Sequence, residues 1–168
     1  MMENENKARK MAVAAHGGQK YGDQPYEYHL AQVVAVLERF GFAADAALVA
    51  AAWLHDALED TALTSDEIEA ECGAETAELV WRVTDEDGAN RRERKAKTYL
   101  KTRESEKAIV LKLADRIANV EAGRAGNQGL LKMYRKEQAV FAESLKPFTT
   151  TGAALDMWNH LEELLSND

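Results

Sequence analysis

An apolar run passes directly into a polar cluster in the stretch Ala46-Ala-Leu-Val-Ala-Ala-Ala-Trp-Leu-His-Asp-Ala-Leu-Glu-Asp-Thr61. Residues three and four apart share one face of a helix, so Glu59 should lie one turn beyond His55. Asp60 should lie one turn beyond Asp56 for the same reason. An imidazole and three carboxyl groups in apolar surroundings need a cation, because burying unpaired charge is costly. The stretch therefore predicts a buried helix with a divalent metal near its end.

Further residues of this kind lie on helical patterns elsewhere in the chain. His29 precedes apolar residues at 30, 33, 34 and 37, which is the spacing of one helix face. Lys112, Asp115 and Asn119 are likewise three and four residues apart in a periodic apolar segment. The order of a His, a His-Asp pair and a distant Asp resembles the metal-ligand order of the HD superfamily of metal-dependent phosphohydrolases.

The resemblance narrows to one branch of that superfamily. Its motifs follow one another here as Ala15-His-Gly-Gly-Gln19, Pro25-Tyr-Glu-Tyr-His29, Trp53-Leu-His-Asp-Ala-Leu-Glu-Asp-Thr61, Val83-Thr-Asp85 and Leu111-Lys-Leu-Ala-Asp-Arg-Ile-Ala-Asn119. The branch is the hydrolase domain of RelA/SpoT-type alarmone enzymes, together with its small stand-alone relatives. The resemblance covers about residues 8–122 and continues more weakly to about residue 145. It implies an all-α HD-type helical bundle, a bound Mn²⁺, and removal of the 3′-pyrophosphate from guanosine tetra- or pentaphosphate.

The same resemblance implies roles for residues around the metal. The implied metal ligands are His29, His55, Asp56 and Asp115. Two imidazoles and two carboxylates form a mixed nitrogen and oxygen set, which suits Mn²⁺ and also Fe²⁺ or Zn²⁺. Glu59 and Asp60 resemble the family pair that orients water and carries protons, which makes them the candidate catalytic residues.

Substrate-binding candidates come first from the positions that match the nucleotide contacts of the family. Asn119 matches a residue that hydrogen-bonds the ribose or base, and Lys112 shares its helix face. The family loop Gln-x-Arg-Lys-x-Gly-x-Pro-Tyr carries an Arg that packs on the guanine ring. Here the loop from Gln19 to Tyr26 is one residue shorter and lacks that Arg, which leaves Lys20 and Tyr21 as candidates. The family His is usually followed by Pro, and this chain has Leu30 instead.

Basic residues are concentrated in one stretch of an otherwise acidic chain. The formal net charge is −8, yet residues 91–116 contain ten Lys or Arg against four Asp or Glu. One interpretation is an exposed helix whose charges pair with one another. The other is a rim that attracts a polyanionic substrate, with Arg94 and Lys95 as the contacts. The stretch includes Asp115, which favours the second interpretation.

Composition limits the class of protein. A chain of 168 residues with 46% hydrophobic residues is expected to form a single domain over residues 1–168. The acidic balance argues against a nucleic-acid partner or a membrane surface. The N-terminus lacks the apolar core of a signal peptide and no apolar run is long enough for a membrane span, so we expect a cytoplasmic protein. The single cysteine, Cys72, excludes an intrachain disulfide. Nothing in the sequence indicates a homo-oligomer.

Apolar periodicity and cap residues predict a chain of helices. They are expected at about residues 8–16, 26–40, 44–58, 64–73, 75–83, 90–103, 105–122, 130–145 and 152–165. The Thr64-Ser-Asp-Glu67 sequence is typical of a capping box. The Asp85-Glu-Asp-Gly88 sequence lacks the other ligands of a calcium loop, so we interpret it as a polar turn. We expect His16 to satisfy carbonyls at the end of the first helix, and His160 to lie at the surface.

Several functions remain open on the sequence alone. The leading hypothesis is a metal-dependent phosphohydrolase that acts on a nucleotide phosphate or pyrophosphate ester. Guanosine tetraphosphate is the first candidate, and another nucleotide or a phosphorylated dinucleotide is the alternative. A nucleotide-binding module without catalysis would not need Glu59 and Asp60. A di-iron oxygenase on the same scaffold would need further His ligands, and only His16 and His160 are left for that role.

Overall fold

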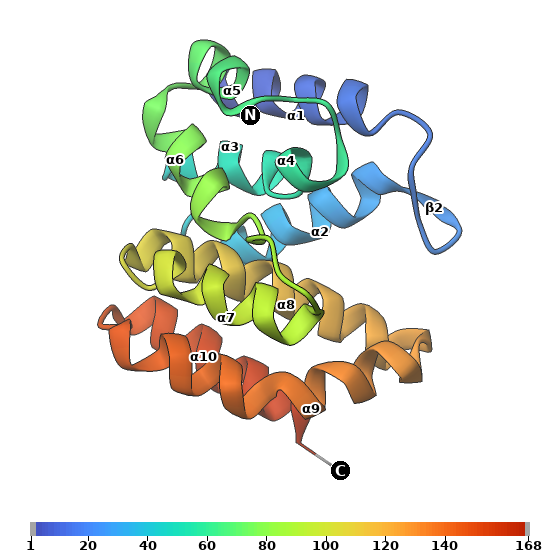
Figure 1. The fold of residues 1–168 in the computed structure, drawn as a ribbon, viewed down its shortest axis with the longest axis vertical. Coiled ribbons are helices and arrows are strands. Elements are labelled where there is room, and N and C mark those ends of the chain that lie inside the picture. The colour runs from blue at the N-terminus through green and yellow to red at the C-terminus, as the bar shows by residue number, and fades with distance from the viewer. Residues whose placement is uncertain (1–2, 167–168) are drawn as a thin grey trace.

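The computed structural model describes residues 3–166 and consists mainly of α-helices (Figure 1). The elements are α1 Glu3–His16, β1 Lys20–Tyr21, β2 Gln24–Pro25, α2 Tyr26–Arg39, α3 Ala46–Leu54, α4 Ala57–Asp60, α5 Ser65–Cys72, α6 Ala74–Val83, α7 Arg91–Thr102, α8 Glu106–Gly126, α9 Gln128–Leu145, the 3-10 helix η1 Lys146–Phe148, and α10 Gly152–Leu165. The all-α prediction is confirmed, with one short hairpin added between α1 and α2.

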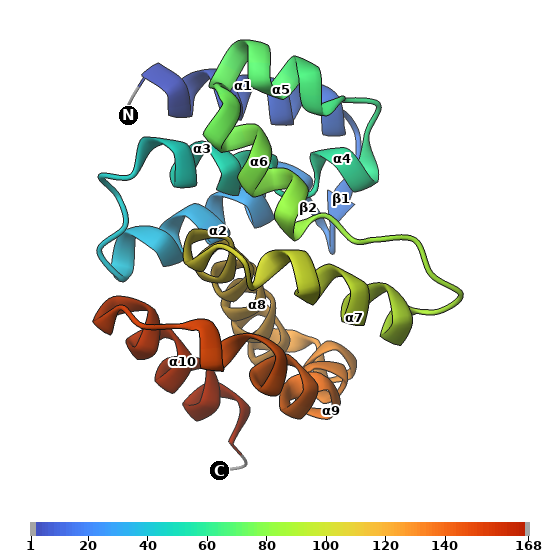
Figure 2. The ribbon, with the colours of Figure 1, turned by 60° about the vertical axis from the view of Figure 1, so that its left-hand side comes forward.

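Helix α8 lies at the centre of the fold. It packs against α2, α6, α9 and α10, and Figure 2 shows it between α2 and the α9–α10 pair. Gly123 allows the close approach of α9, since a Cβ at this position would lie 3.1 Å from the backbone nitrogen of Leu131. Because neighbours enclose the helix on several sides, its buried residues include polar ones such as Arg116 and Asn119. The helix is therefore a rigid support for Asp115.

Helix α3 is the second buried helix, and every residue from Leu48 to Leu54 is buried. Asp45 caps its N-terminus, where the Asp45 carboxylate accepts a hydrogen bond from the Leu48 amide at 3.1 Å. Helices α1, α2 and α6 pack around it. Because α3 is apolar and buried, its packing fixes the position of His55, which follows directly after it.

The predicted helix over residues 44–58 is wrong in its length, because α3 ends at Leu54 and a separate single turn, α4, follows. His55 Nδ1 lies 2.8 Å from the Ala52 carbonyl, which a continuous helix would use for the amide of Asp56. Asp56 has φ −98° and ψ −1°, outside regular helix geometry. The amide of Asp60 still donates to the Asp56 carbonyl at 3.0 Å, so Asp60 keeps its expected place one turn beyond Asp56.

Side-chain caps set the starts of several helices. The capping box at Thr64 is confirmed, with the Glu67 amide 3.3 Å from Thr64 Oγ1 and the Thr64 amide 2.8 Å from Glu67 Oε2. Asn90 caps α7 by accepting from the Glu93 amide at 3.0 Å. Ser105 caps α8 in the same way. These caps place the helix starts within a residue of the positions that the sequence predicts.

A short antiparallel hairpin projects beside the start of α2 (Figure 1). Lys20 pairs with Pro25 and Tyr21 with Gln24, across a turn in which Gly22 has φ +59°. The sequence predicted a loop here. Two residues in each strand are too few to leave a period-two pattern that a sequence could reveal.

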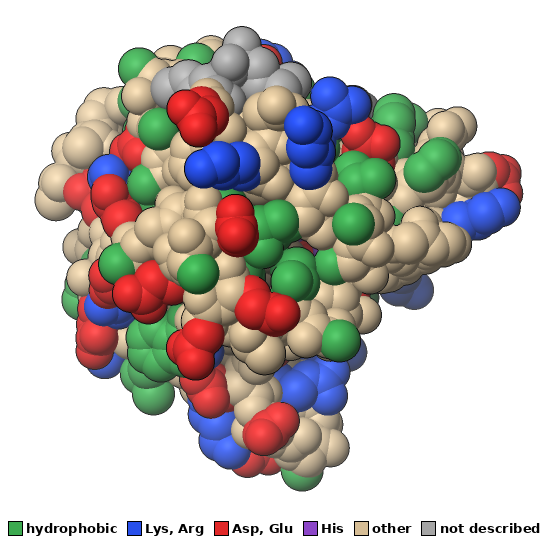
Figure 3. Space-filling model, turned by 90° about the horizontal axis from the view of Figure 1, so that it is seen from above, with side chains coloured by type: hydrophobic (Ala, Val, Ile, Leu, Met, Phe, Trp, Pro, Cys, Tyr) green, Lys and Arg blue, Asp and Glu red, His purple; other side chains and the backbone are tan. Residues whose placement is uncertain are grey.

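Acidic and basic side chains are interspersed on the face seen from above in Figure 3. Among residues 3–166, no helix has both the length and the apolar character needed to cross a membrane.

Candidate active site

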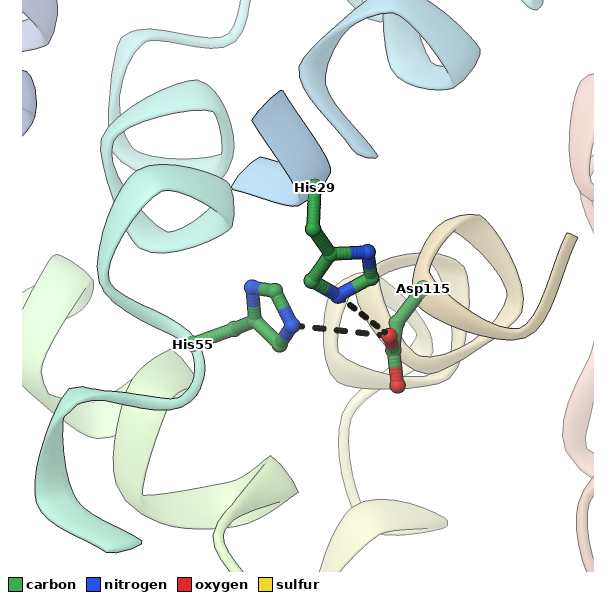
Figure 4. Close-up of side chains that lie close together, drawn as sticks. All are labelled: His29, His55 and Asp115. Carbon is green, nitrogen blue, oxygen red and sulfur yellow. Dashed lines mark ion pairs between the residues drawn. The ribbon is translucent and has the colours of Figure 1, made fainter. Parts of the chain in front are cut away.

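Three side chains from three separate helical segments converge at one point (Figure 4). His29 comes from α2, His55 follows α3, and Asp115 comes from α8. Asp115 Oδ1 lies 3.3 Å from His29 Nε2 and 3.5 Å from His55 Nε2. One ligand atom from each lies within 4.8 Å of the others, and both imidazoles are buried.

Asp56 borders this cluster. Its Oδ2 lies 2.9 Å from His55 Nε2 and 3.7 Å from His29 Nε2. The same oxygen accepts a hydrogen bond from the Tyr26 hydroxyl at 2.5 Å. Desolvation and the negative charge of Asp56 raise the pKa of the Tyr26 hydroxyl, which therefore stays protonated and acts as a donor.

The donor set has the chemistry of a metal site. His55 Nδ1 is bound to the Ala52 carbonyl, which leaves Nε2 directed at the carboxylates. That Nε2 is buried, and no described residue forms a directed hydrogen bond with it. Burial alone would lower the pKa of His55, but Asp56 and Asp115 outweigh it and raise the pKa well above its usual range. A divalent cation among these groups could balance the carboxylates in place of that proton.

Asp115 is held in place from the other side by Asn119. Burial alone would raise the pKa of Asp115, but the adjacent imidazoles of His29 and His55 hold it well below its usual range. Asn119 Nδ2 donates to Asp115 Oδ1 at 2.7 Å and to its carbonyl at 3.0 Å. Asn119 Oδ1 accepts from the Tyr21 hydroxyl at 2.8 Å. The amide of Asn119 is thus engaged on both sides, and it links the hairpin to α8.

His29, Asp56 and Asp115 lie on one wall of a cleft of about 600 Å³. The cleft lies among the hairpin, α2, α4, the loop before α7, and α7 to α9. Its lining is Tyr21, Tyr26, His29, Asp56, Leu58, Glu59, Asp60, Thr84, Asp85, Glu86, Asp87, Arg91, Arg94, Lys95, Lys112, Asp115, Asn119 and Tyr134.

Glu59 and Asp60 line the cleft beside the His and Asp cluster. Glu59 Oε1 accepts a hydrogen bond from the Asp85 amide at 2.5 Å. Desolvation of the Glu59 carboxyl, with a further contribution from the charge of Asp85, raises its pKa above the usual value. Asp60 Oδ2 accepts from Gln19 Nε2 at 2.8 Å. The Glu59 carboxylate is thus held by the backbone of Asp85, and the Asp60 carboxylate by the side chain of Gln19.

The predicted substrate-binding residues divide into those inside the cleft and one outside it. Lys112 lines the cleft and donates to the Val83 carbonyl at 3.0 Å. Burial would lower the pKa of Lys112, but nearby carboxylates, Asp115 first, raise it above its usual value. Tyr21 stacks on His29 with ring centroids 4.6 Å apart, and burial raises its pKa to about 12. Lys20 is exposed on the hairpin and does not line the cleft.

Most of the basic stretch is paired with acidic groups. Lys95 contacts both oxygens of Asp85, at 3.0 and 2.9 Å, and burial lowers the pKa of Lys95. Arg91 forms an ion pair with Glu137 at 2.7 Å. The guanidinium of Arg94 lines the cleft without an ion pair or hydrogen bond to any described side chain. Paired charges and cations without an ion pair thus occur together in this stretch, and the rim that attracts a polyanionic substrate stays a prediction.

Sequence reasoning missed several cleft residues. The loop at Asp85 was interpreted as a polar turn, yet it forms a wall of the cleft. The Val83-Thr-Asp85 motif was the signal that could have found it. Tyr26, Arg91 and Tyr134 also line the cleft, and only Tyr26 belongs to a quoted motif.

The two remaining histidines lie outside the cluster. His16 was expected to satisfy helix-end carbonyls. Its Nδ1 lies instead 2.9 Å from Gln19 Oε1, and its ring stacks on Tyr26. His160 is partly exposed, as expected of a surface residue, and its Nε2 lies 3.1 Å from Glu121 Oε1.

The amino-acid sequence is similar to those of several known proteins. A guanosine-3′,5′-bis(diphosphate) 3′-pyrophosphohydrolase of Aquifex aeolicus is 31% identical over 169 residues, covering 96% of this chain and 23% of that protein. A Xenopus tropicalis protein named guanosine-3′,5′-bis(diphosphate) 3′-pyrophosphohydrolase MESH1 is 35% identical over 117 residues, covering 67% of this chain and 65% of that protein. The chain thus spans about a quarter of the bacterial relative.

A solved structure supports the fold. The structure of a metazoan ortholog of SpoT, described as hydrolysing ppGpp, matches with a TM-score of 0.79 and 24% identity, over 98% of this chain and 94% of that one. This likeness confirms the HD-type helical fold. The family model described as HD domain matches residues 8–144. By this match over most of its length, and by the fold, the chain belongs to the HD domain family.

Proposed function

We propose that this protein is a metal-dependent phosphohydrolase that removes a phosphate or pyrophosphate group from a nucleotide. The observation that carries the proposal is the convergence of two buried imidazoles and two carboxylates beside a cleft that is also lined by Lys and Arg side chains. The names of the relatives make guanosine 3′,5′-bis(diphosphate) the first candidate substrate and its 3′-pyrophosphate the group removed.

We propose His29, His55, Asp56 and Asp115 as the metal ligands. The distances of 2.9–3.7 Å between their ligand atoms support this set. Mixed imidazole and carboxylate ligands favour Mn²⁺, with Fe²⁺ or Zn²⁺ as alternatives. When bound, such an ion supplies a Lewis acid and lowers the pKa of a coordinated water.

We propose Glu59 and Asp60 as the catalytic residues, which would donate and accept protons during the reaction. The raised pKa of Glu59 brings it closer to neutral pH, where a carboxyl can both give and take a proton. Asp60 already accepts a hydrogen bond from Gln19, so its second oxygen is available to a water molecule or to the substrate. Their position beside the cluster on the cleft wall supports this role.

The proposed substrate contacts lie mainly across the cleft. Arg94, Lys95 and Lys112 would bind phosphate oxygens, with Arg94 the best placed because it has no competing carboxylate. Tyr21 and Asn119 would contact the nucleoside, since both line the cleft next to the cluster. Lys20 could reach a bound substrate only from the exposed hairpin, which makes it the weakest of the six.

The deciding experiment is a turnover screen of the Mn²⁺-loaded protein. The panel contains alarmones, nucleoside mono- to triphosphates and phosphorylated dinucleotides. Release of pyrophosphate from guanosine 3′,5′-bis(diphosphate) would support the first candidate, and turnover of another member would select the alternative. Binding without turnover would indicate a nucleotide-binding module. A di-iron oxygenase is not favoured, because His16 and His160 contact Gln19 and Glu121.

Two broader predictions accompany this function. We propose that residues 1–168 act as one domain, since a single cluster of buried apolar residues extends from α1 to α10. A cytoplasmic location, predicted from the sequence, would give access to a nucleotide substrate and stays a prediction.

A further inference from the structure

The carboxylate of Asp60 is the end of a chain of hydrogen bonds that begins at His16. Gln19 stands between them, with Nε2 at 2.8 Å from Asp60 Oδ2 and Oε1 at 2.9 Å from His16 Nδ1. The backbone of Gln19 is also held, because its amide donates to the His16 carbonyl and its carbonyl accepts from the Tyr26 amide. Both ends of this side chain are therefore occupied, and neither contact belongs to a helix or to the hairpin ladder.

The direction of each hydrogen bond follows from the chemistry of the groups. An ionised carboxylate can only accept, so the NH₂ of Gln19 must face Asp60. The amide oxygen of Gln19 then faces His16, and it too can only accept. His16 must therefore carry its proton on Nδ1. The Asp60 carboxylate thus fixes which way the Gln19 amide faces, and the Gln19 amide fixes which nitrogen of His16 carries the proton.

The surroundings of His16 favour the same proton position. The side chain is buried, with 7% of its surface exposed, and its ring stacks on Tyr26 at a centroid distance of 4.5 Å. Its Nε2 is buried without a hydrogen-bond partner among the described residues. A proton on Nε2 would be a buried donor left unsatisfied, which is costly. With the proton on Nδ1, the donor is satisfied by Gln19 and Nε2 is left only as an acceptor without a partner.

We propose that His16 and Gln19 form a positioning pair that fixes the orientation of the Asp60 carboxylate at the cleft. This inference rests on the proposed function, in which Asp60 handles protons. His16 and Gln19 do not line the cleft and are not members of the His29, His55 and Asp115 cluster, so they would act only through their neighbours.

The first test removes the donor from Gln19. Gln19→Met keeps the length of the side chain but cannot hydrogen-bond, and Gln24→Met on the exposed hairpin strand is the matched control. With Mn²⁺ saturating and guanosine 3′,5′-bis(diphosphate) as substrate, we expect kcat of Gln19→Met to fall about three- to tenfold, the value of one hydrogen bond. KM, Mn²⁺ content and the melting temperature should stay near those of the control.

The second test separates the donor of His16 from its ring. His16→Phe keeps the stacking on Tyr26 but has no donor, so we expect the same fall in kcat as in Gln19→Met. His16→Asn keeps a donor near the Nδ1 position but loses the ring, so at saturating Mn²⁺ it should retain more of the wild-type kcat than His16→Phe. The reverse order would overturn the positioning role and assign His16 to ring packing alone.

A spectroscopic measurement tests the pair without any substrate. Long-range ¹H–¹⁵N spectra of the metal-free protein should show His16 as the Nδ1-protonated tautomer in the wild type and not in Gln19→Met. An Nε2-protonated His16 in the wild type would overturn the inference. If Asp60→Asn loses turnover while Gln19→Met keeps it, the positioning pair is wrong and the function stands. If Asp60→Asn keeps full turnover, the proposed role of Asp60 is wrong.

Discussion

The Nδ1 atom of His55 lies 2.8 Å from the Ala52 carbonyl oxygen. This contact has two effects, one on the backbone of α3 and one on the orientation of the imidazole ring. It uses an acceptor that a longer α3 would need, so the helix ends before the site. It also fixes the ring so that Nε2 points at Asp56 and Asp115. A second contact of this kind is made by Tyr26, whose hydroxyl holds Asp56. Groups that orient ligands often matter almost as much as the ligands themselves.

At this scale the metal assignment is tested by removing ligands. His55→Ala and Asp115→Ala should each lose bound Mn²⁺ and lower the melting temperature of the metal-treated protein, because a ligand that binds only the folded state stabilises it. His160→Ala, outside the cluster, is the control and should keep its metal. Elemental analysis and thermal melts measure both effects. Full metal occupancy in the two ligand variants would contradict the assignment.

The Tyr26 contact predicts a milder effect. Tyr26→Phe keeps the ring against His16 and His29 but removes the hydrogen bond to Asp56. We expect the Mn²⁺ affinity to fall about 10- to 100-fold, as is usual when a group that orients a ligand is lost. Tyr28→Phe alters an exposed ring on the same helix and serves as the control. Competition with a metal indicator measures the change, and equal affinities for the two variants would argue against a role for the Tyr26 hydroxyl.

The candidate catalytic residues predict the opposite pattern, in which metal is kept and turnover is lost. Glu59→Gln and Asp60→Asn preserve the size of each side chain and leave the four proposed ligands in place. Loss of general acid–base help typically slows a reaction ~10²–10⁴-fold. Initial rates and Mn²⁺ content should be measured on the same samples. Near wild-type rates in both variants would place the chemistry elsewhere.

At the scale of elements, the sequence predicted the helices well where a cap or an apolar period marks them. The starts of α5, α7 and α8 follow Thr64, Asn90 and Ser105, all of which have capping side chains. The end of α3 could not be predicted, because it depends on a bond from a side chain to the backbone rather than on periodicity. The hairpin could not be predicted either, since its strands have two residues each.

The same limit applies to the candidate site. His29, His55 and Asp115 were found because each lies in a motif, and the fold brings them together. Some pairs of the basic stretch could not be predicted, because their partners are distant in the sequence. Arg91 pairs with Glu137, and Lys107 with Asp45. Only the folded chain distinguishes such paired cations from one that is left for a ligand.

Helix α7 therefore allows a matched pair of variants on one element. Arg94 lines the cleft without a partner, whereas Arg92 is exposed and lies outside it. Arg94→Gln should raise KM for the substrate more than it lowers kcat, as expected when uniform binding is lost. Adding Lys95→Gln should increase the effect on KM. Arg92→Gln should leave both constants unchanged, and equal effects of Arg92→Gln and Arg94→Gln would exclude a specific contact.

At the scale of the whole molecule, the cleft lies where two sets of elements meet. One side carries the His29 imidazole of α2 and the carboxylates of Asp56, Glu59 and Asp60. The other side carries the cations Arg91, Arg94 and Lys95 of α7. Asp115 and Lys112, both from the central helix α8, border the two sides. A substrate with several phosphates fits this division, with one group beside the proposed metal ligands and others beside the cations. We therefore expect the cleft to recognise the phosphate charges of a nucleotide more strongly than the identity of its base.

The choice of base is the consequence that can be measured. The hairpin lacks the Arg that its resemblance to alarmone hydrolases would place on guanine, and one face of Tyr21 is covered by His29. Stacking on an aromatic ring tolerates any base and contributes ~1–3 kcal/mol. We therefore expect guanosine 3′,5′-bis(diphosphate) and its adenosine counterpart to be turned over with kcat/KM values within about tenfold of each other.

Salt provides the second arm of that experiment, because exposed charges are screened as the ionic strength rises. Raising sodium chloride from about 50 to about 500 mM should increase KM for both substrates by a similar factor and leave kcat nearly unchanged. Arg94→Gln should weaken this salt dependence, since the variant has already lost the screened contact. Strict preference for guanine, or a KM that does not change with salt, would show that recognition depends on the base and that the hairpin makes contacts beyond Tyr21.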